Sequence, residues 1–84
     1  MPPTDVPNVW SIDPEGAVAA DLVRMVGVGF TDATAVTVDG TAAEFLVVDD
    51  TLIHLVIPAG SAGDVPVVVT NAIGASDAFT YTRG

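Results

Sequence analysis

Short runs of β-branched and aliphatic residues, separated by Gly, Pro, Asp and Asn, recur along the whole chain. Apolar runs of this length with turn-forming residues between them are typical of β-strands, and no segment has the apolar spacing of a helix. The pattern predicts strands at residues 8–12, 22–27, 35–38, 45–48, 52–57, 65–71 and 78–82. A chain of 84 residues built in this way predicts an all-β fold, an antiparallel β-sandwich of about seven strands.

The segments between the predicted strands contain residues that favour turns. They are Asp13-Pro14-Glu15-Gly16, Asp39-Gly40, Asp49-Asp50 and Pro58-Ala59-Gly60. Asp39-Gly40 has the composition of a tight hairpin turn. The chain is long enough for one core only, so we expect a single domain over residues 8–84 and an extended, proline-rich N-terminal arm over residues 1–7.

The order and spacing of these residues resemble the IPT/TIG domains, which are immunoglobulin-like sandwiches of the early-set type, over nearly the whole chain. The resemblance rests on Ile12, Pro14, Gly16, Val23, Met25, Gly27, Phe30, Val36, Thr37, Val38, Gly40, Ala42, Asp50, Thr51, Ile53, Ile57, Pro58, Ala59, Gly60, Ala62, Gly63, Val65, Val67, Val69, Asn71, Gly74, Ser76, Phe79 and Tyr81. Two positions depart from the family pattern: its paired glycines are Ala19-Ala20 here, and its Asn before the phenylalanine is Gly29.

The resemblance also implies which side chains point into the core. They are Val23, Met25, Val36, Val38, Ile53, Leu55, Ile57, Val65, Val67, Val69, Phe79 and Tyr81. Because successive side chains of a strand point to opposite faces, the residues between them must lie on the outside. Several of these outward positions are apolar, where such positions in the family look mostly like Thr, Ser or Asp.

The family topology places the strands at residues 22–27 and 52–57 side by side, and we therefore expect an apolar patch on the outside of one sheet. We predict an interface formed by Leu22, Arg24, Val26, Val28, Leu52, His54, Val56 and Val68. The alternative is that these are isolated surface residues of no special function, or that a bulge reverses the facing. A patch of this size would bind weakly by itself, so many copies or several contacts would have to act together.

The charge of the chain excludes several classes of partner. The net charge is −9, with 11 acidic residues, no cysteine and only Arg24 and Arg83 as basic residues. This composition is unsuited to neutralising phosphates, so we expect neither nucleic acid nor a membrane surface as a partner. The N-terminus has no basic residue and no apolar stretch of the kind found in a signal peptide.

Candidate catalytic and metal-binding residues are few. His54 is the sole histidine, and without cysteine or lysine the chain cannot supply a typical set of base and nucleophile, so we expect no enzyme and no cofactor. Asp13 with Glu15, or Asp49 with Asp50, could begin a calcium site, but acidic residues in turns usually accept local backbone hydrogen bonds, and we expect no metal.

Two further features have a structural and a functional interpretation. Trp10 could stack on a sugar, although an aromatic residue in the first strand of a small sandwich is more often an anchor in the core or at its rim. Gly27 and Gly29 lack the helix and acidic partner of a dinucleotide motif, and we interpret them as bulge or close-approach glycines.

The resemblance suggests two functions. Small single immunoglobulin-like proteins of this kind resemble accessory structural proteins of tailed bacteriophages, so the first hypothesis is a minor capsid or decoration protein. It would be made in the host cytoplasm and would bind in many copies to the capsid exterior, contacting the major capsid protein or copies of itself. The alternative is a carbohydrate-binding or cell-adhesion module, with loops around Asp32, Asp49 and Asn71 in contact with a glycan or a cell-surface protein.

Overall fold

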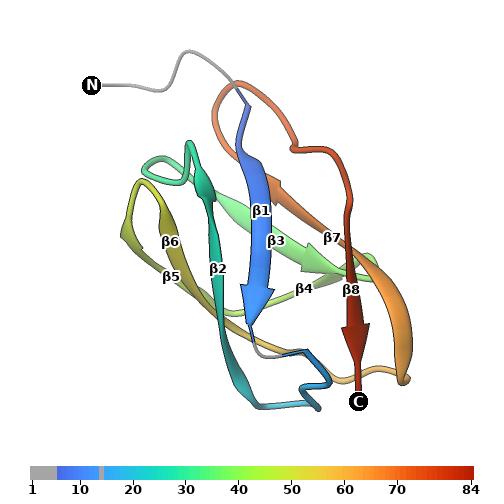
Figure 1. Cartoon of the computed structure of the whole chain (residues 1–84). Helices are drawn as coiled ribbons and strands as arrows, with labels where there is room; N and C mark the ends of the chain where they lie inside the picture. The colour runs from blue at the N-terminus through green and yellow to red at the C-terminus, as the bar shows by residue number, and fades with distance from the viewer. Residues whose placement is uncertain (1–5, 14) are drawn as a thin grey trace.

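The computed structural model describes residues 6–13 and 15–84 and contains two four-stranded antiparallel sheets packed face to face (Figure 1). The strands are β1 (Asn8–Asp13), β2 (Leu22–Val28), β3 (Ala35–Val38), β4 (Thr41–Ala42), β5 (Phe45–Asp49), β6 (Leu52–Val56), β7 (Gly63–Thr70) and β8 (Phe79–Arg83). Sheet A has the order β1-β2-β6-β5 and sheet B the order β4-β3-β7-β8. The predicted all-β sandwich is confirmed.

The seven predicted strands correspond to seven of these elements, and the short β4 was missed. β4 pairs with β3 across the turn Asp39-Gly40, where Val38 lies opposite Thr41. Both turn residues have positive φ, 53° at Asp39 and 77° at Gly40, as a two-residue hairpin turn of the primed type requires. The hairpin expected at Asp39-Gly40 is therefore confirmed, and its second strand is too short to show a period-two pattern in the sequence.

The core lies between the inner faces of the two sheets, and strand alternation fills it. The buried apolar side chains are Ile12, Ala17, Val23, Met25, Phe30, Val36, Val38, Ile53, Leu55, Ile57, Val65, Val67, Val69 and Tyr81. Of the side chains expected inside, only Phe79 is half-buried, and it packs against this cluster. The assignment of side chains to the inside of the sandwich, made from the sequence, is thus correct on every strand for which it was made.

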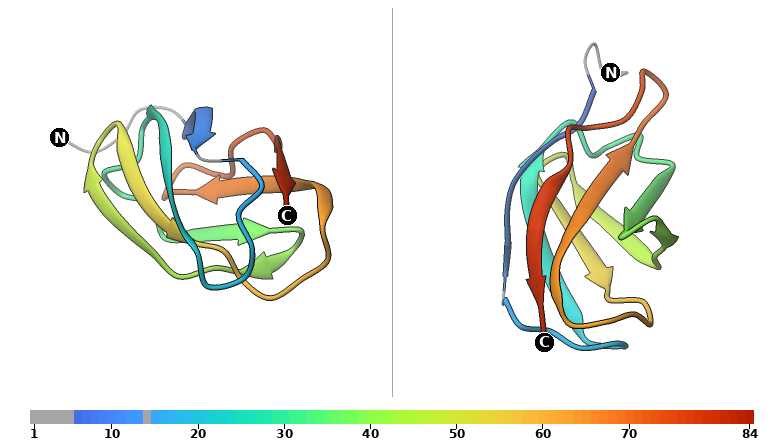
Figure 2. Two further views of the ribbon diagram at one scale, coloured as in Figure 1. Left: turned by 60° about the horizontal axis from the view of Figure 1, so that its bottom comes forward. Right: turned by 90° about the vertical axis from the view of Figure 1, so that its right-hand side faces the viewer.

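The two sheets are joined at one edge, where β1 and β8 lie side by side (Figure 2). The connection from β1 to β2 runs along β8: Gly16 N–H donates to the Thr82 carbonyl at 2.8 Å, and Gly84 N–H donates to the Ala17 carbonyl at 3.1 Å. The buried Arg83 donates from Nη2 to the carbonyl of Pro58. These bonds hold the last strand to both neighbouring loops.

The N-terminal arm expected over residues 1–7 lies mostly outside the described residues. The described part, Val6 and Pro7, lies against the sandwich: Pro7 is fully buried, and its Cα is close to Gly29. Gly29 has φ of 78°, and Gly27 leaves no room for a Cβ atom beside the Asn8 carbonyl and the Phe30 ring. The interpretation of both glycines as structural is confirmed.

The turn between β5 and β6 is held by its two carboxylates. Asp49 Oδ1 accepts hydrogen bonds from the N–H and hydroxyl of Thr51, both at 2.7 Å. Asp50 accepts from the Thr31 hydroxyl at 2.7 Å and from the N–H groups of Gly29 and Thr31. The Thr31 hydroxyl, followed by these two N–H groups, lowers the pKa of Asp50, and the Thr51 bonds lower the pKa of Asp49.

Ala20 gives a first prediction, because it occupies a backbone conformation that suits glycine. Its φ is 72°, it stands where the family has a glycine, and its N–H donates to the Ile57 carbonyl at 2.8 Å. A left-handed conformation costs an L-residue about 1 kcal/mol. We expect Ala20→Gly to stabilise the protein by about 0.5–1 kcal/mol, measured by urea unfolding. The neighbouring Ala19→Gly, with no such strain to relieve, should be neutral or destabilising; equal effects of the two would contradict the explanation.

Asp50 gives a second prediction, on pH. A carboxyl group whose pKa is lowered in the folded state contributes stability above its unfolded value near 3.8, and that contribution disappears as the pH falls through the folded value. We expect Asp50→Ala to lower the urea midpoint at neutral pH and the difference from the parent to shrink below pH 3.8. Asp32→Ala, in the adjacent loop, is the control and should show no such convergence. A pH-independent effect of Asp50→Ala would contradict the assignment.

Candidate functional site

The outer face of sheet A carries most of the residues predicted to form an interface. Leu22 lies opposite Val56, Arg24 opposite His54, and Val26 opposite Leu52. Leu22 is 58% exposed and Val26 is 36% exposed. The outward side chains of β6, which are Leu52, His54 and Val56, are half-buried. Sequence reasoning therefore brought these side chains together correctly, on the two central strands of one sheet. Their use as an interface stays a prediction.

Val28 and Val68 do not join the centre of this group. Val28 is half-buried at the end of β2, opposite Asn8. Val68 lies on β7, opposite Thr37, in the outer face of sheet B. Including Val68 in the same interface was wrong, because it has the same outward facing as the others but belongs to the sheet on the opposite side of the sandwich.

Strand β5 adds apolar side chains that the sequence analysis left out. Leu46, 64% exposed, lies opposite His54, and Val48, 48% exposed, lies at the irregular pairing of β5 with β6. Alternation along this strand would have identified them, because Phe45 and Val47 pack against the core and Leu46 and Val48 therefore point outward. We define the apolar strip as the outward apolar side chains of β2, β6 and β5. It consists of Leu22, Val26, Leu46, Val48, Leu52 and Val56.

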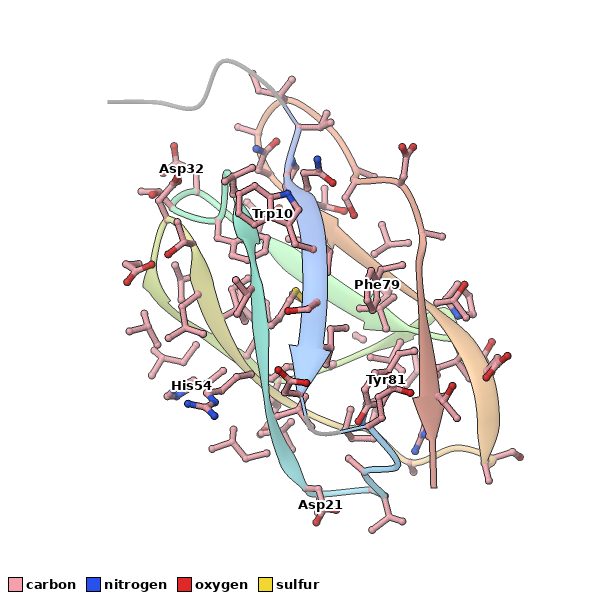
Figure 3. All side chains as sticks on the ribbon, viewed as in Figure 1. Trp10, Asp21, Asp32, His54, Phe79 and Tyr81 are labelled. Carbon is pink, nitrogen blue, oxygen red and sulfur yellow. The ribbon has the colours of Figure 1, made fainter. Side chains whose placement is uncertain are left out.

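A shallow hollow of about 310 Å³ lies within the apolar strip. It is lined by Leu22, Glu44, Phe45, Leu46, His54 and Val56. His54 is half-buried on β6 between Arg24 and Leu46 in the strand register, and its ring extends away from the sandwich (Figure 3). No hydrogen bond or ion pair joins it to a carboxylate in the described part of the chain. The geometry gives a shallow, mostly apolar hollow beside His54, and its use for binding stays a prediction.

Trp10 lies beside the apolar strip on the edge strand β1 and is 59% exposed. The register of β1 shifts between Val9 and Ser11, so that Trp10 is the extra residue of a bulge and lies with Ser11 opposite Val26. Figure 3 shows the indole between the ribbons of β1 and β2. Of the two positions expected for Trp10, in the core or at its rim, the core position is wrong, because the bulge interrupts the alternation that would have turned the side chain inward.

Polar side chains flank Trp10 along the same strand. Asn8 and Asp13 are exposed, and Ser11 is half-buried. Within residues 6–13 and 15–84, none of these three side chains takes part in a hydrogen bond. We call the outward side chains of β1, which are Asn8, Trp10, Ser11 and Asp13, the Trp10 strip. It combines one aromatic platform with free hydrogen-bonding groups on either side.

Of the three residues around which glycan-contacting loops were predicted, Asn71 and Asp49 hold their own turns, and contact of these loops with a glycan stays a prediction. Asn71 Oδ1 accepts from the N–H groups of Ile73 and Gly74, at 2.8 and 3.1 Å, and shapes the turn after β7. Asp49 holds its own turn, as described above, and Asp32 is exposed in the loop before β3. Among the described residues, no group of three or more His, Asp or Glu side chains could hold a metal ion. The described chain also contains no helix long and apolar enough to cross a membrane.

Known structures share this sandwich as one part of longer chains. It is similar to a gamma-CGTase from Alkalophilic bacillus clarkii, with a TM-score of 0.83 and 25% identity over 93% of this chain and 12% of that chain. An SGBP-B from a xyloglucan utilization locus in Bacteroides uniformis matches with a TM-score of 0.78 and 13% identity, over 93% and 23% of the two chains. The Bacteroides ovatus mixed-linkage glucan SGBP-B, in complex with a mixed-linkage heptasaccharide, matches with a TM-score of 0.71 and 23% identity, over 96% and 23%.

The two SGBP-B likenesses are fold likenesses only, and this chain spans less than a quarter of the length of each of the three proteins. No curated protein sequence matches it. The family model described as IPT/TIG domain matches residues 7–82, which include all eight strands except the last residue of β8. This domain is a non-catalytic type of module, and the chain belongs to the IPT/TIG domain family.

Proposed function

We propose that this chain is a non-catalytic immunoglobulin-like module that binds a neutral glucan through the Trp10 strip. The single observation that carries the proposal is the exposed indole of Trp10, placed by a bulge on an open sheet face between the free polar groups of Asn8, Ser11 and Asp13. An indole face covers the C–H surface of a sugar ring, and adjacent amide, hydroxyl and carboxylate groups bond to its hydroxyls. Arg24, opposite Asp13, extends the polar groups onto β2.

The charge of the chain favours a neutral ligand. With a net charge of −9, the module repels anionic polysaccharides at long range, whereas an uncharged glucan meets no such barrier. Two of the similar structures are named for glucan utilization loci, and one of them holds a glucan oligosaccharide. These names favour a glucan as the first class of ligand to test.

The capsid hypothesis gains no support from these comparisons, since none of the three named structures is a virion protein. The apolar strip on which that hypothesis depended belongs to a different part of sheet A from the Trp10 strip. Docking on a major capsid protein at a virion exterior therefore remains a separate prediction of the sequence analysis, and we give preference to the carbohydrate-binding alternative.

The proposal predicts measurable binding of neutral glucans and its dependence on Trp10. We expect titration calorimetry and affinity electrophoresis to detect binding to mixed-linkage glucan, xyloglucan or starch oligosaccharides. Trp10→Ala should weaken it at least about tenfold, because burial of a large aromatic surface is worth more than the roughly 1.4 kcal/mol of a tenfold change. Trp10→Phe should retain part of the affinity through a smaller stacking surface.

A matched control is Ile73→Ala, which removes a side chain of similar exposure, 55%, from the loop between β7 and β8. It should leave glucan binding unchanged. The proposal is wrong if the parent binds none of these neutral glucans, or if Trp10→Ala binds them as tightly as the parent while both proteins are folded.

A further inference from the structure

The apolar strip has a different chemistry from the Trp10 strip. Its side chains on β2, β6 and β5 form three neighbouring columns, and four of them are between 36% and 64% exposed. They offer methyl groups and no aromatic platform, which suits another protein surface and not a sugar. The outer face of sheet B carries Thr37, Pro66, Thr80 and Thr82 with one half-buried valine, Val68, so it is less apolar than the outer face of sheet A.

Two opposite charges flank the apolar strip. Arg24 is exposed on β2, and Glu44 is exposed at the start of β5, where its carbonyl accepts a hydrogen bond from Val56 N–H at 2.9 Å. The strand order β2-β6-β5 puts β6 between them, so a cationic side chain lies on one side of the middle column and an anionic one on the other. No ion pair joins either side chain to another residue within the described part of the chain.

We propose that the apolar strip binds the apolar strip of a second copy of this chain, about a two-fold axis that runs along β6. Such an axis lays β2 of one copy over β5 of the other, because β2 and β5 flank β6 on opposite sides. By the strand register, Arg24 of each copy then lies over Leu46 of the other, and its long side chain is one outward position along the strand from Glu44, which gives two equivalent pairs of opposite charge. A face that complements itself in this way is what an isologous dimer needs.

The pairing leaves the Trp10 strip outside the contact. In sheet A, β1 lies beyond β2, and no strand of the second copy covers it when β2 overlies β5. The dimer thus presents two Trp10 strips at opposite edges, where two glucan segments, or two parts of one polymer, could be held together. The pairing itself does not depend on glucan binding, and the two proposals can fail separately.

The dimer should be weak and should respond to salt in a particular direction. The strip is small compared with the surface of about 800 Å² per partner that a stable interface buries. Two chains of net charge −9 also repel each other, and salt screens that repulsion beyond about 8 Å at physiological ionic strength. Added salt should therefore strengthen the association, because it screens the repulsion between two chains of net charge −9 more than the attraction of two exposed charge pairs, and it does not weaken the apolar contact.

The first test is sedimentation velocity of the parent chain from about 1 μM to about 1 mM, the range in which an interface of this size dissociates. We expect a monomer–dimer equilibrium that moves toward the dimer in high salt. Leu46→Asp should weaken dimerisation at least about tenfold. Val68→Asp places the same charge on the outer face of sheet B, and it should change dimerisation little.

The second test addresses the axis along β6. Arg24→Glu and Glu44→Arg should each weaken the dimer about tenfold, because each replaces attractive pairs by repulsive ones. The double variant, with both charges exchanged, should recover most of the affinity. Circular dichroism and urea unfolding identify any variant that does not fold, and such a variant is replaced by Arg24→Gln or Glu44→Gln.

Three outcomes would overturn the proposal. They are a parent chain that stays monomeric up to 1 mM, equal effects of Leu46→Asp and Val68→Asp, or a double charge exchange that recovers nothing. Loss of glucan binding in Trp10→Ala with an unchanged dimer would uphold both proposals. Dimerisation without any glucan binding would uphold this one alone.

Discussion

The alternation of side chains along strands that share one core is the constraint on which the rest of this structure depends. Every second residue of β2, β6 and β7 is buried between the sheets, and each burial fixes its neighbour on the outside. In Leu22–Val28 and Phe45–Asp49, both the inward and most of the outward positions are apolar. The inward side chains fill the core, and the outward ones are left facing water. The apolar strip is the consequence of filling the core from strands that are apolar throughout.

The outer faces of the two sheets differ in the residues at their outward positions. On sheet B the outward positions of β7 are Asp64, Pro66, Val68 and Thr70, and those of β8 are Thr80 and Thr82, so one valine stands among mostly polar residues. Sheet A keeps Leu and Val at outward positions, although the same turns and the same charge would tolerate Thr there. Exposed aliphatic side chains favour aggregation, and their concentration on sheet A is the observation from which the dimer is proposed.

Sequence reasoning succeeded where local chemistry decides the outcome. The family resemblance implied the inward side chains of β2, β3, β6, β7 and β8, and alternation then placed their neighbours outside. The turn at Asp39-Gly40 followed from residues that tolerate positive φ. Sequence reasoning failed for pairings between distant strands other than β2 and β6, which the family topology placed side by side correctly. The sheet to which Val68 belongs, the pairing of β4 and the position of Leu46 beside His54 are set by strand order, and local periodicity contains no information about strand order.

The position of the Trp10 side chain on β1 depends on a small residue of the neighbouring strand β2, Gly27. A Cβ atom at position 27 would lie 2.0 Å from the Asn8 carbonyl oxygen and 2.7 Å from the Phe30 ring. The close approach of β1 to β2 at this point therefore requires glycine, and directly after it the register of β1 shifts, so that Trp10 becomes the extra residue. With regular pairing, alternation would turn either Trp10 or Ser11 toward the core. Gly27 and the bulge together leave Ile12 inside and Trp10 outside, which makes Gly27 a positioning residue for the proposed glucan platform although it lies on the other strand.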